Sequence, residues 1–126
     1  MAQYKDGLHT EKYKNGTLGW WKNGQYHRDG DLPAVITANV RVEWRQNGEL
    51  HRDGDKPAYI DANGNLQWWQ NGQTHRICGP AVIWADGTLE WWINGEEITQ
   101  EVRAWLNRKR WRGTPEQIVE FQLRFT

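Results

Sequence analysis

The stretch that decides the fold is Gly19–Ile36, which reads Gly-Trp-Trp-Lys-Asn-Gly-Gln-Tyr-His-Arg-Asp-Gly-Asp-Leu-Pro-Ala-Val-Ile. The pattern returns from Trp44 and from Trp68, and a fourth copy opens at Trp91 and stops after Gly95. The four Asn-Gly pairs that follow the tryptophans begin at positions 23, 47, 71 and 94, so they lie 24, 24 and 23 residues apart. A fixed period of this length is the signature of a repeat architecture.

Each copy carries two turn signals. One is the Asn-Gly pair after the tryptophans, and the other is an Asn-Gly or Asp-Gly pair before them, at Asn15, Asn63 and Asp86. Asn39-Val40 is the imperfect second signal of the second copy, and residues 1–13 resemble a half-repeat that has lost one residue. Asn-Gly and Asp-Gly between apolar residues are strong hairpin signals. We therefore predict a mainly β, α+β fold: one antiparallel meander of roughly seven to nine strands with a C-terminal helical segment that caps it.

Two-residue turns at both signals would fix the strand register and the two faces. At the first turn we expect Trp21 opposite Tyr26. At the second we expect Ala38 opposite Arg41, Thr37 opposite Val42 and Val35 opposite Trp44. One face would then carry the columns Leu18-Val42-Leu66-Leu89, Trp20-Trp44-Trp68-Trp91, Val35-Tyr59-Val82 and His27-His51-His75. The other would carry Trp21-Arg45-Trp69-Trp92, Ile36-Ile60-Ile83, Ala34-Ala58-Ala81 and Arg28-Arg52-Arg76.

Length and composition bound the class of protein. A chain of 126 residues suits a single domain, 1–126, and its net charge is zero. The sequence has no apolar run long enough to span a membrane and no apolar leader at its start, so we expect no membrane partner. The only cysteine, Cys78, excludes an internal disulfide and favours a reducing, cytoplasmic location. The chain contains no serine, which excludes a serine nucleophile.

The repeats end near residue 98, so residues 1–98 form the repeat part and residues 99–126 the helical cap. Thr99 is the expected N-cap of a helix that runs to about Arg110 and stops before Gly113. The segment Thr114–Gln117 predicts a second helix start, with a capping box and a proline at the first helical position. Residues 118–125 fit a helix and a strand equally well, and the sequence leaves that choice open.

No constellation in the sequence predicts a metal site or a catalytic site. The three repeat histidines, His27, His51 and His75, lie two strands apart, roughly 9–10 Å, so they cannot share one zinc ion. We expect each of them to pack beside its tryptophan and to bond a loop carbonyl. The aspartate pairs of the loops (Asp29 with Asp31, Asp53 with Asp55) fit Asx-turns better than a calcium site. Cys78 has no activating partner beyond His75, so we do not expect a catalytic thiol. We expect no cofactor and no enzymatic activity.

The repeat consensus Trp-x-Asn-Gly-x-x-His-Arg-x-x-Gly-x-Pro-Ala resembles a hairpin-repeat family that is abundant in phage and giant-virus proteins. It is similar, more loosely, to MORN repeats. The resemblance covers about residues 13–98, and the third copy departs from it with Ile77-Cys78-Gly79. It implies an interaction module: a phage-encoded inhibitor or adaptor of a host protein, such as a defence component, acting in the host cytoplasm.

Two sets of arginines and tryptophans are candidate binding surfaces. The column Arg28-Arg52-Arg76 shares its expected face with Trp21, Trp69 and Trp92, where cation–π contacts would form either an internal ladder or a recognition surface. The basic run comprises Arg103, Arg108, Lys109, Arg110 and Arg112, and it is interleaved with Trp105 and Trp111. Such a run is typical of a solvated helix face or of a face that docks an acidic protein, and it can also bind single-stranded nucleic acid.

We predict a non-enzymatic protein-binding module whose partner is a host protein. The predicted partner-binding residues are Arg76, Trp92, Arg108, Arg110 and Trp111. The alternative is a nucleic-acid-binding protein that uses the basic C-terminal segment. A competing interface along the whole arginine column stays open, as do the identity of the partner and the oligomeric state.

Overall fold

A computed structural model of the chain describes residues 7–126. The expected half-repeat falls partly on residues 1–6, which lie outside the described residues. The main sheet contains nine strands: β1 (Leu8–Lys12), β2 (Leu18–Lys22), β3 (Gln25–Tyr26), β4 (Val35–Ile36), β5 (Val42–Glu43), β8 (Tyr59–Ile60), β9 (Leu66–Gln67), β12 (Val82–Ile83) and β13 (Leu89–Glu90). Their pairings are antiparallel, and eight follow the spatial order β1-β2-β4-β5-β8-β9-β12-β13, with β3 beside β2. The predicted fold class, an antiparallel hairpin meander, is confirmed.

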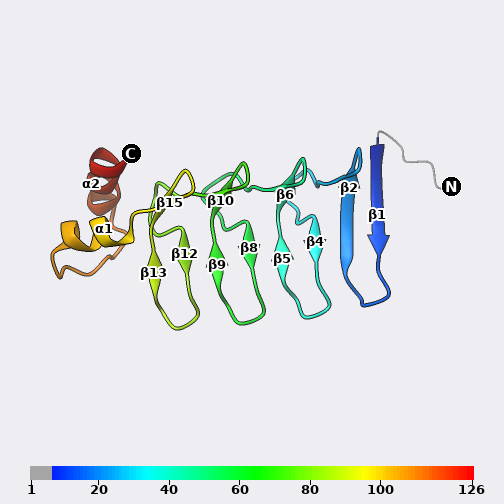
Figure 1. Cartoon of the computed structure of the whole chain (residues 1–126), viewed down its shortest axis with the longest axis horizontal. Helices are drawn as coiled ribbons and strands as arrows, with labels where there is room; N and C mark the ends of the chain where they lie inside the picture. Colours follow the sequence, from blue (N-terminus) through cyan, green and yellow to red (C-terminus); the bar gives the residue numbers. More distant parts are fainter. Residues whose placement is uncertain (1–6) are drawn as a thin grey trace.

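Three two-stranded ribbons leave the main sheet directly after Trp44, Trp68 and Trp91. They pair β6 (Arg45–Gln46) with β7 (Glu49–Leu50), β10 (Trp69–Gln70) with β11 (Gln73–Thr74), and β14 (Trp92–Ile93) with β15 (Glu96–Glu97). Figure 1 shows them in a row along one edge of the sheet, while the other hairpin turns line the opposite edge. Trp44, Trp68 and Trp91 are therefore each followed by a separate ribbon, whereas β3, the counterpart after Trp20, pairs with β2 in the main sheet.

The Asn-Gly turns after the tryptophans are the predicted two-residue turns. In each of them both residues have positive φ, from Asn23 (50°) and Gly24 (81°) to Asn94 (49°) and Gly95 (81°). This is the conformation of a type I′ turn. The expected pairing of Trp21 with Tyr26 is confirmed.

The second turn of each copy is one residue longer than predicted, so our register there was wrong. Thr37 donates its N–H to the Arg41 carbonyl over 2.9 Å, which leaves three residues in the turn, and Val40 has a φ of 65°. In the other copies the residue at this place is Gly16, Gly64 or Gly87. A type I turn followed by one left-handed residue gives this geometry. As a result Val35 lies opposite Glu43, and Ile36 lies opposite Val42.

A one-residue shift moves side chains to the other face of a sheet. Ile36 lies opposite Leu18 as well as Val42, so the isoleucine column joins the leucine face rather than the opposite one. The column of Val35, Tyr59 and Val82 moves the other way and lies beside Glu43, Gln67 and Glu90. The face assignment of these two columns is therefore exchanged.

Two helices follow the last ribbon, α1 (Thr99–Leu106) and α2 (Pro115–Phe125). Thr99 is not the N-cap that we expected. Ile98 is, and the Thr99 hydroxyl accepts the Trp91 N–H over 3.0 Å instead. Helix α1 ends at Leu106 rather than near Arg110, because Asn107 adopts a left-handed conformation with a φ of 47°.

Helix α2 settles the choice that the sequence left open, because residues 118–125 are helical. Thr114 is its N-cap, as predicted, and accepts the Gln117 N–H over 3.2 Å, with Pro115 at the first helical position. The Gln117 side chain does not complete a capping box. Its Oε1 accepts from the backbone N–H groups of Arg112 (2.6 Å) and Gly113 (3.1 Å), just before the helix.

The two helices close the end of the sheet that is farthest from β1 (Figure 1). Trp91 of the last repeat, Val102 and Leu106 of α1, and Phe121 of α2 form a buried cluster there. Leu89, Ile93, Ile98, Trp105, Trp111 and Phe125 pack around it. Burial of apolar side chains at an exposed sheet end is what a terminal cap provides in a repeat protein.

Candidate functional site

The three repeat arginines lie flat on tryptophan rings. The Cζ atoms of Arg28, Arg52 and Arg76 lie 3.9, 3.7 and 3.9 Å from the ring centroids of Trp20, Trp44 and Trp68. We predicted such contacts with Trp21, Trp69 and Trp92, and that pairing is wrong. Each guanidinium lies over the first tryptophan of its own copy and also donates to the carbonyl of the proline that closes the following loop.

Two of these arginines also hold an aspartate from the preceding loop. Arg52 Nε lies 2.8 Å from Asp31 Oδ1, and Arg76 Nε lies 2.8 Å from Asp55 Oδ1. The hydrogen bonds from Arg52 and then from Lys56 lower the pKa of Asp31 to about 2. Adjacent copies are therefore joined by an arginine that is stacked on one side and ion-paired on its edge. These contacts satisfy Arg52 and Arg76 internally, so the arginine column is not a uniformly free surface.

The histidines join the copies at a second point. Nδ1 of His27, His51 and His75 accepts the N–H of Asn47, Asn71 and Asn94, the first residue of the next type I′ turn, over 3.0, 3.0 and 2.9 Å. We expected a loop carbonyl as partner, and the partner is a backbone N–H instead. An accepting Nδ1 places the ring proton on Nε2. In the first two copies Nε2 faces the aspartate two residues on, at 2.8 Å and 2.9 Å.

The third loop departs from this scheme and contacts the cap. Ile77 stands where the other copies have the aspartate that faces the histidine. The Gln122 side chain of α2 donates to the Ile77 carbonyl over 3.2 Å. Burial raises the pKa of the neighbouring Cys78 thiol and lowers the pKa of His75. A thiol of raised pKa is a poor nucleophile at neutral pH.

Trp111 anchors the segment between the two helices. Its ring meets those of Trp91 and Phe121 edge-on, with centroids 6.0 and 5.9 Å apart. A Cβ on Gly79 would lie 3.2 Å from Arg76 Nη1 and 3.5 Å from Trp111 Cζ2. The structure therefore brings Arg76 and Trp111, two of the predicted site residues, together on either side of Gly79.

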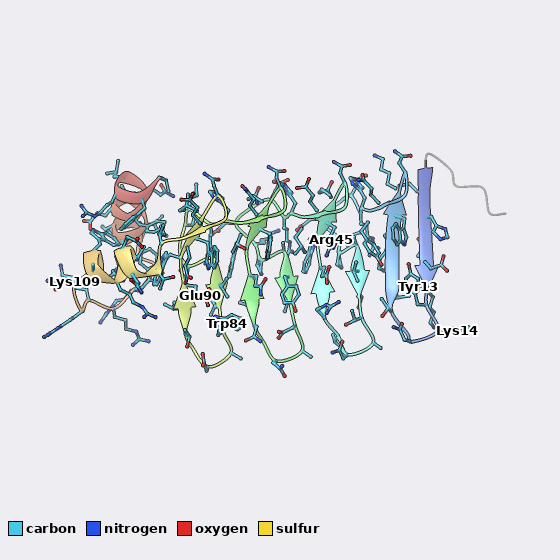
Figure 2. All side chains as sticks on the ribbon, viewed as in Figure 1. Tyr13, Lys14, Arg45, Trp84, Glu90 and Lys109 are labelled. Carbon is cyan, nitrogen blue, oxygen red and sulfur yellow. The ribbon has the colours of Figure 1, made fainter. Side chains whose placement is uncertain are left out.

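We call the segment 108–112 the basic connector. It carries Arg108, Lys109, Arg110 and Arg112, all of which are exposed, and no ion pair to any of them occurs among the described residues. Figure 2 shows Lys109 at the extreme end of the molecule. Gln117 of α2 fixes the backbone of the connector, because its side chain accepts from the Arg112 and Gly113 N–H groups and donates to the Arg110 carbonyl over 3.0 Å.

Trp92, the fifth predicted site residue, lies apart from the basic connector. Its Nε1 donates to Glu90 Oε1 over 2.9 Å, and the second oxygen of Glu90 accepts from Trp84 Nε1 over 2.6 Å. Both Trp84 and Glu90 are labelled in Figure 2. Within residues 7–126, no hydrogen bond, ion pair or ring contact links Trp92 to the connector. The role of all five residues in partner binding stays a prediction.

Sequence reasoning missed two features of the structure. Asp31 and Asp55 were interpreted as turn residues, whereas they are the partners of the next arginine. Their constant separation of 21 residues from that arginine is the signal that could have found them. Gln117 was expected to cap its own helix, and no feature of the sequence indicates that it braces the connector.

Comparison with known proteins returned no matching family model, no matching curated protein and no matching solved structure. None of the helices in the described part of the chain is long and apolar enough to cross a membrane.

Proposed function

We propose that this chain is a non-enzymatic protein-binding module that presents its basic connector to an acidic partner protein. The observation that carries the proposal is a group of four exposed cations, at positions 108, 109, 110 and 112, without a counter-charge among residues 7–126. Exposed basic side chains on a braced backbone speed the encounter with an acidic surface and orient it. The stacked and ion-paired repeats serve as the rigid support.

A binding role fits the remaining polar groups better than catalysis does. The arginines, histidines and aspartates of the loops repeat along the sheet and contact one another, whereas an active site needs one unique constellation. The resemblance of the repeat consensus to phage and giant-virus hairpin-repeat proteins supports a narrower version. In that version the module is a phage-encoded inhibitor or adaptor of a host protein and acts in the host cytoplasm.

The test is a capture experiment with matched charge-reversal variants. Tagged wild-type protein is used to capture partners from a host lysate, in parallel with the double variant Arg108→Glu, Arg110→Glu. The control is Lys12→Glu, Lys14→Glu, which reverses two exposed cations at the other end of the molecule. We expect one acidic protein to be retained by the wild type and the control and lost with the connector variant. Equal retention by all three would contradict the proposal.

The alternative partner is single-stranded nucleic acid, which the same uncompensated cations favour. Fluorescence anisotropy of a labelled single-stranded oligonucleotide separates the two. Four phosphate contacts would weaken binding about 50-fold between roughly 50 and 200 mM salt. Protein binding by the connector predicts no oligonucleotide binding at the higher salt concentration. Tight, steeply salt-dependent binding that the connector variant abolishes would favour the nucleic-acid function instead.

A further inference from the structure

Arg52 and Arg76 show what the edge of a repeat arginine binds. In each, Nε and Nη2 face the two oxygens of one carboxylate, at 2.8 and 3.4 Å for Asp31 and at 2.8 and 3.2 Å for Asp55. Nη1 points the other way, to a proline carbonyl at 3.0 or 3.1 Å. We call the Nε and Nη2 pair the guanidinium fork. A two-point contact of this kind is the strong form of an arginine–carboxylate bond.

Arg28 is held in the same way, but no carboxylate within residues 7–126 meets it. It stacks on Trp20 with its Cζ 3.9 Å from the ring centroid, and its Nη1 donates to the Pro33 carbonyl over 3.3 Å. The residue 21 positions before it, where Asp31 and Asp55 stand relative to their arginines, is Gly7. No hydrogen bond or ion pair to the fork of Arg28 occurs among the described residues. Within the part of the chain that the structure describes, the row of repeat arginines therefore begins with a fork that is oriented and open.

We propose that the fork of Arg28 is a binding site for a carboxylate group of a partner protein, supplied by an acidic side chain or by a chain terminus. This carboxylate takes the place that Asp31 and Asp55 occupy in the next two copies. The site lies in the first copy, away from the basic connector, and does not depend on the connector's role. The two filled forks in the same molecule are the template for its geometry.

Two local features support the site. The stacking and the Pro33 bond immobilise the arginine before the ligand arrives, so binding loses less side-chain entropy than it would with a free arginine. The neighbouring aspartate, Asp29, already faces His27 at 2.8 Å, as Asp53 faces His51 beside the filled fork of Arg52. Asp29 beside Arg28 therefore has the same arrangement as Asp53 beside Arg52, whose fork holds a carboxylate.

The adjoining residue gives the site an apolar side. Lys56, which adds a second contact to Asp31 over 2.9 Å, is replaced at the equivalent place in the first loop by Leu32. Leu32 is 45% exposed. A carboxylate at Arg28 therefore meets one cation and one aliphatic side chain, where Asp31 meets two cations. This favours an acidic residue that is flanked by an apolar one.

The test uses the arginine Nε–H signals of the full chain in ¹H–¹⁵N NMR spectra, titrated with sodium acetate against sodium chloride at equal ionic strength. We expect a saturable shift of the Arg28 signal with a millimolar dissociation constant, while the Arg52 and Arg76 signals stay in place. N-acetyl-aspartic acid amide and N-acetyl-leucine then distinguish a side-chain carboxylate from a chain terminus. Whichever of the two binds more tightly identifies the source.

Three variants keep the test decisive. Arg28→Lys retains the charge without the fork. Acetate binding, followed in both proteins at the indole N–H signal of Trp20, should weaken about tenfold or more. Asp31→Ala opens the fork of Arg52, so a new acetate response at Arg52 should appear. Asp6→Asn removes the one acidic residue that precedes Gly7 in the chain, and the acetate response of Arg28 should not depend on this change.

The proposal is overturned if Arg28 does not respond to acetate, if Arg28→Lys binds it as well as the wild type does, or if the response appears only in Asp6→Asn. None of these outcomes involves the connector variants, so the proposed function would be unaffected by them.

Discussion

At the scale of the residue, the repeat arginines and histidines join one copy to the next. Each repeat arginine has a stacked face, and from the second copy onward it also has an ion-paired edge, while each histidine accepts a hydrogen bond from the next turn. Exposed ion pairs contribute little on their own. Here they coincide with a cation–π contact and a bond to a backbone carbonyl, so the joint is made by several weak contacts that act together.

The hydrogen bond from the Asn94 N–H to His75 Nδ1 predicts that the stability of the protein depends on pH. Protonation of Nδ1 would remove the acceptor for the Asn94 N–H, and burial lowers the pKa of His75 below its usual 6.5. The folded state therefore binds this proton less readily than the unfolded chain. The contribution of His75 to stability is complete above pH 6.5 and is lost as the pH falls below that value. Asp53, Asp55, Arg76 and Cys78 line the same pocket and form its electrostatic surroundings.

Urea unfolding at pH 7.5 and at pH 5.5 measures this effect when the wild type is compared with His75→Gln. The amide oxygen of glutamine can accept the Asn94 N–H but does not titrate. We expect the free energy of unfolding of the wild type to fall more between the two pH values than that of the variant. Equal decreases would show that His75 does not titrate with folding.

At the scale of the element, the two kinds of turn show where sequence reasoning succeeds and where it stops. The pairs Asn23-Gly24 and Asn15-Gly16 look alike in the sequence. In the first both residues have positive φ, whereas in the second only the glycine does. The two turns differ because the strands that they connect continue differently. The course of those strands depends on their pairing with the neighbouring copy. The number of hairpins was therefore predictable, but the register of the second turn was not.

The two C-terminal helices show the same limit of sequence-based prediction. Thr114 and Pro115 mark the start of α2 by local chemistry alone, and that prediction is confirmed. Thr99 has the residue type of an N-cap, but a tertiary contact uses its hydroxyl, which accepts the Trp91 N–H. Periodicity could not choose helix or strand for residues 118–125. The choice follows from the core, in which Phe121 is fully buried and Leu123 is 83% exposed.

The type I′ turns predict the cost of a β-branched residue. Gly72 has a φ of 78°, where a valine is strained, so Gly72→Val should lower the free energy of unfolding by about 1–2 kcal/mol. Chemical denaturation followed by tryptophan fluorescence measures the change. Gln73→Val, at the exposed start of β11, is the control and should lie within about 0.5 kcal/mol of the wild type. If the two variants were equally stable, the turn assignment would be wrong.

At the scale of the whole molecule, the chain is a one-dimensional array with unlike ends. Among residues 7–126 the arginine fork of the first copy is open, and the last copy is closed by two helices (Figure 1). Contacts between neighbours determine the stability of such arrays, so a lost cap exposes the last copy first. The repeat array was predictable from the period of the sequence. The way in which Trp111 and Gln117 fix the connector was not. Trp111 acts through a ring contact with Trp91 of the last repeat, and Gln117 turns back to the irregular backbone just before its own helix, which has no pattern in the sequence.

The cap can be tested by removing Trp111. Its ring packs between Trp91 and Phe121 and is partly buried, so Trp111→Ala should cost near the lower end of the roughly 3–5 kcal/mol typical of large aromatic side chains. In hydrogen exchange we expect α2 to lose protection while β2 and β5 keep theirs. Leu123→Ala, at an exposed position of the same helix, should leave exchange unchanged. Uniform loss of protection along the chain would contradict a locally attached cap.

The central claim is that the basic connector binds the partner while the repeats support it. Isothermal titration calorimetry with the captured partner measures this claim most directly, once the thermal melts of the variants match that of the wild type. We predict that Arg108→Glu, Arg110→Glu raises the dissociation constant by about 100-fold or more, the loss of two interfacial charge contacts. The control Lys12→Glu, Lys14→Glu should stay within about threefold of the wild type. A connector variant that binds as tightly as the wild type would contradict the account.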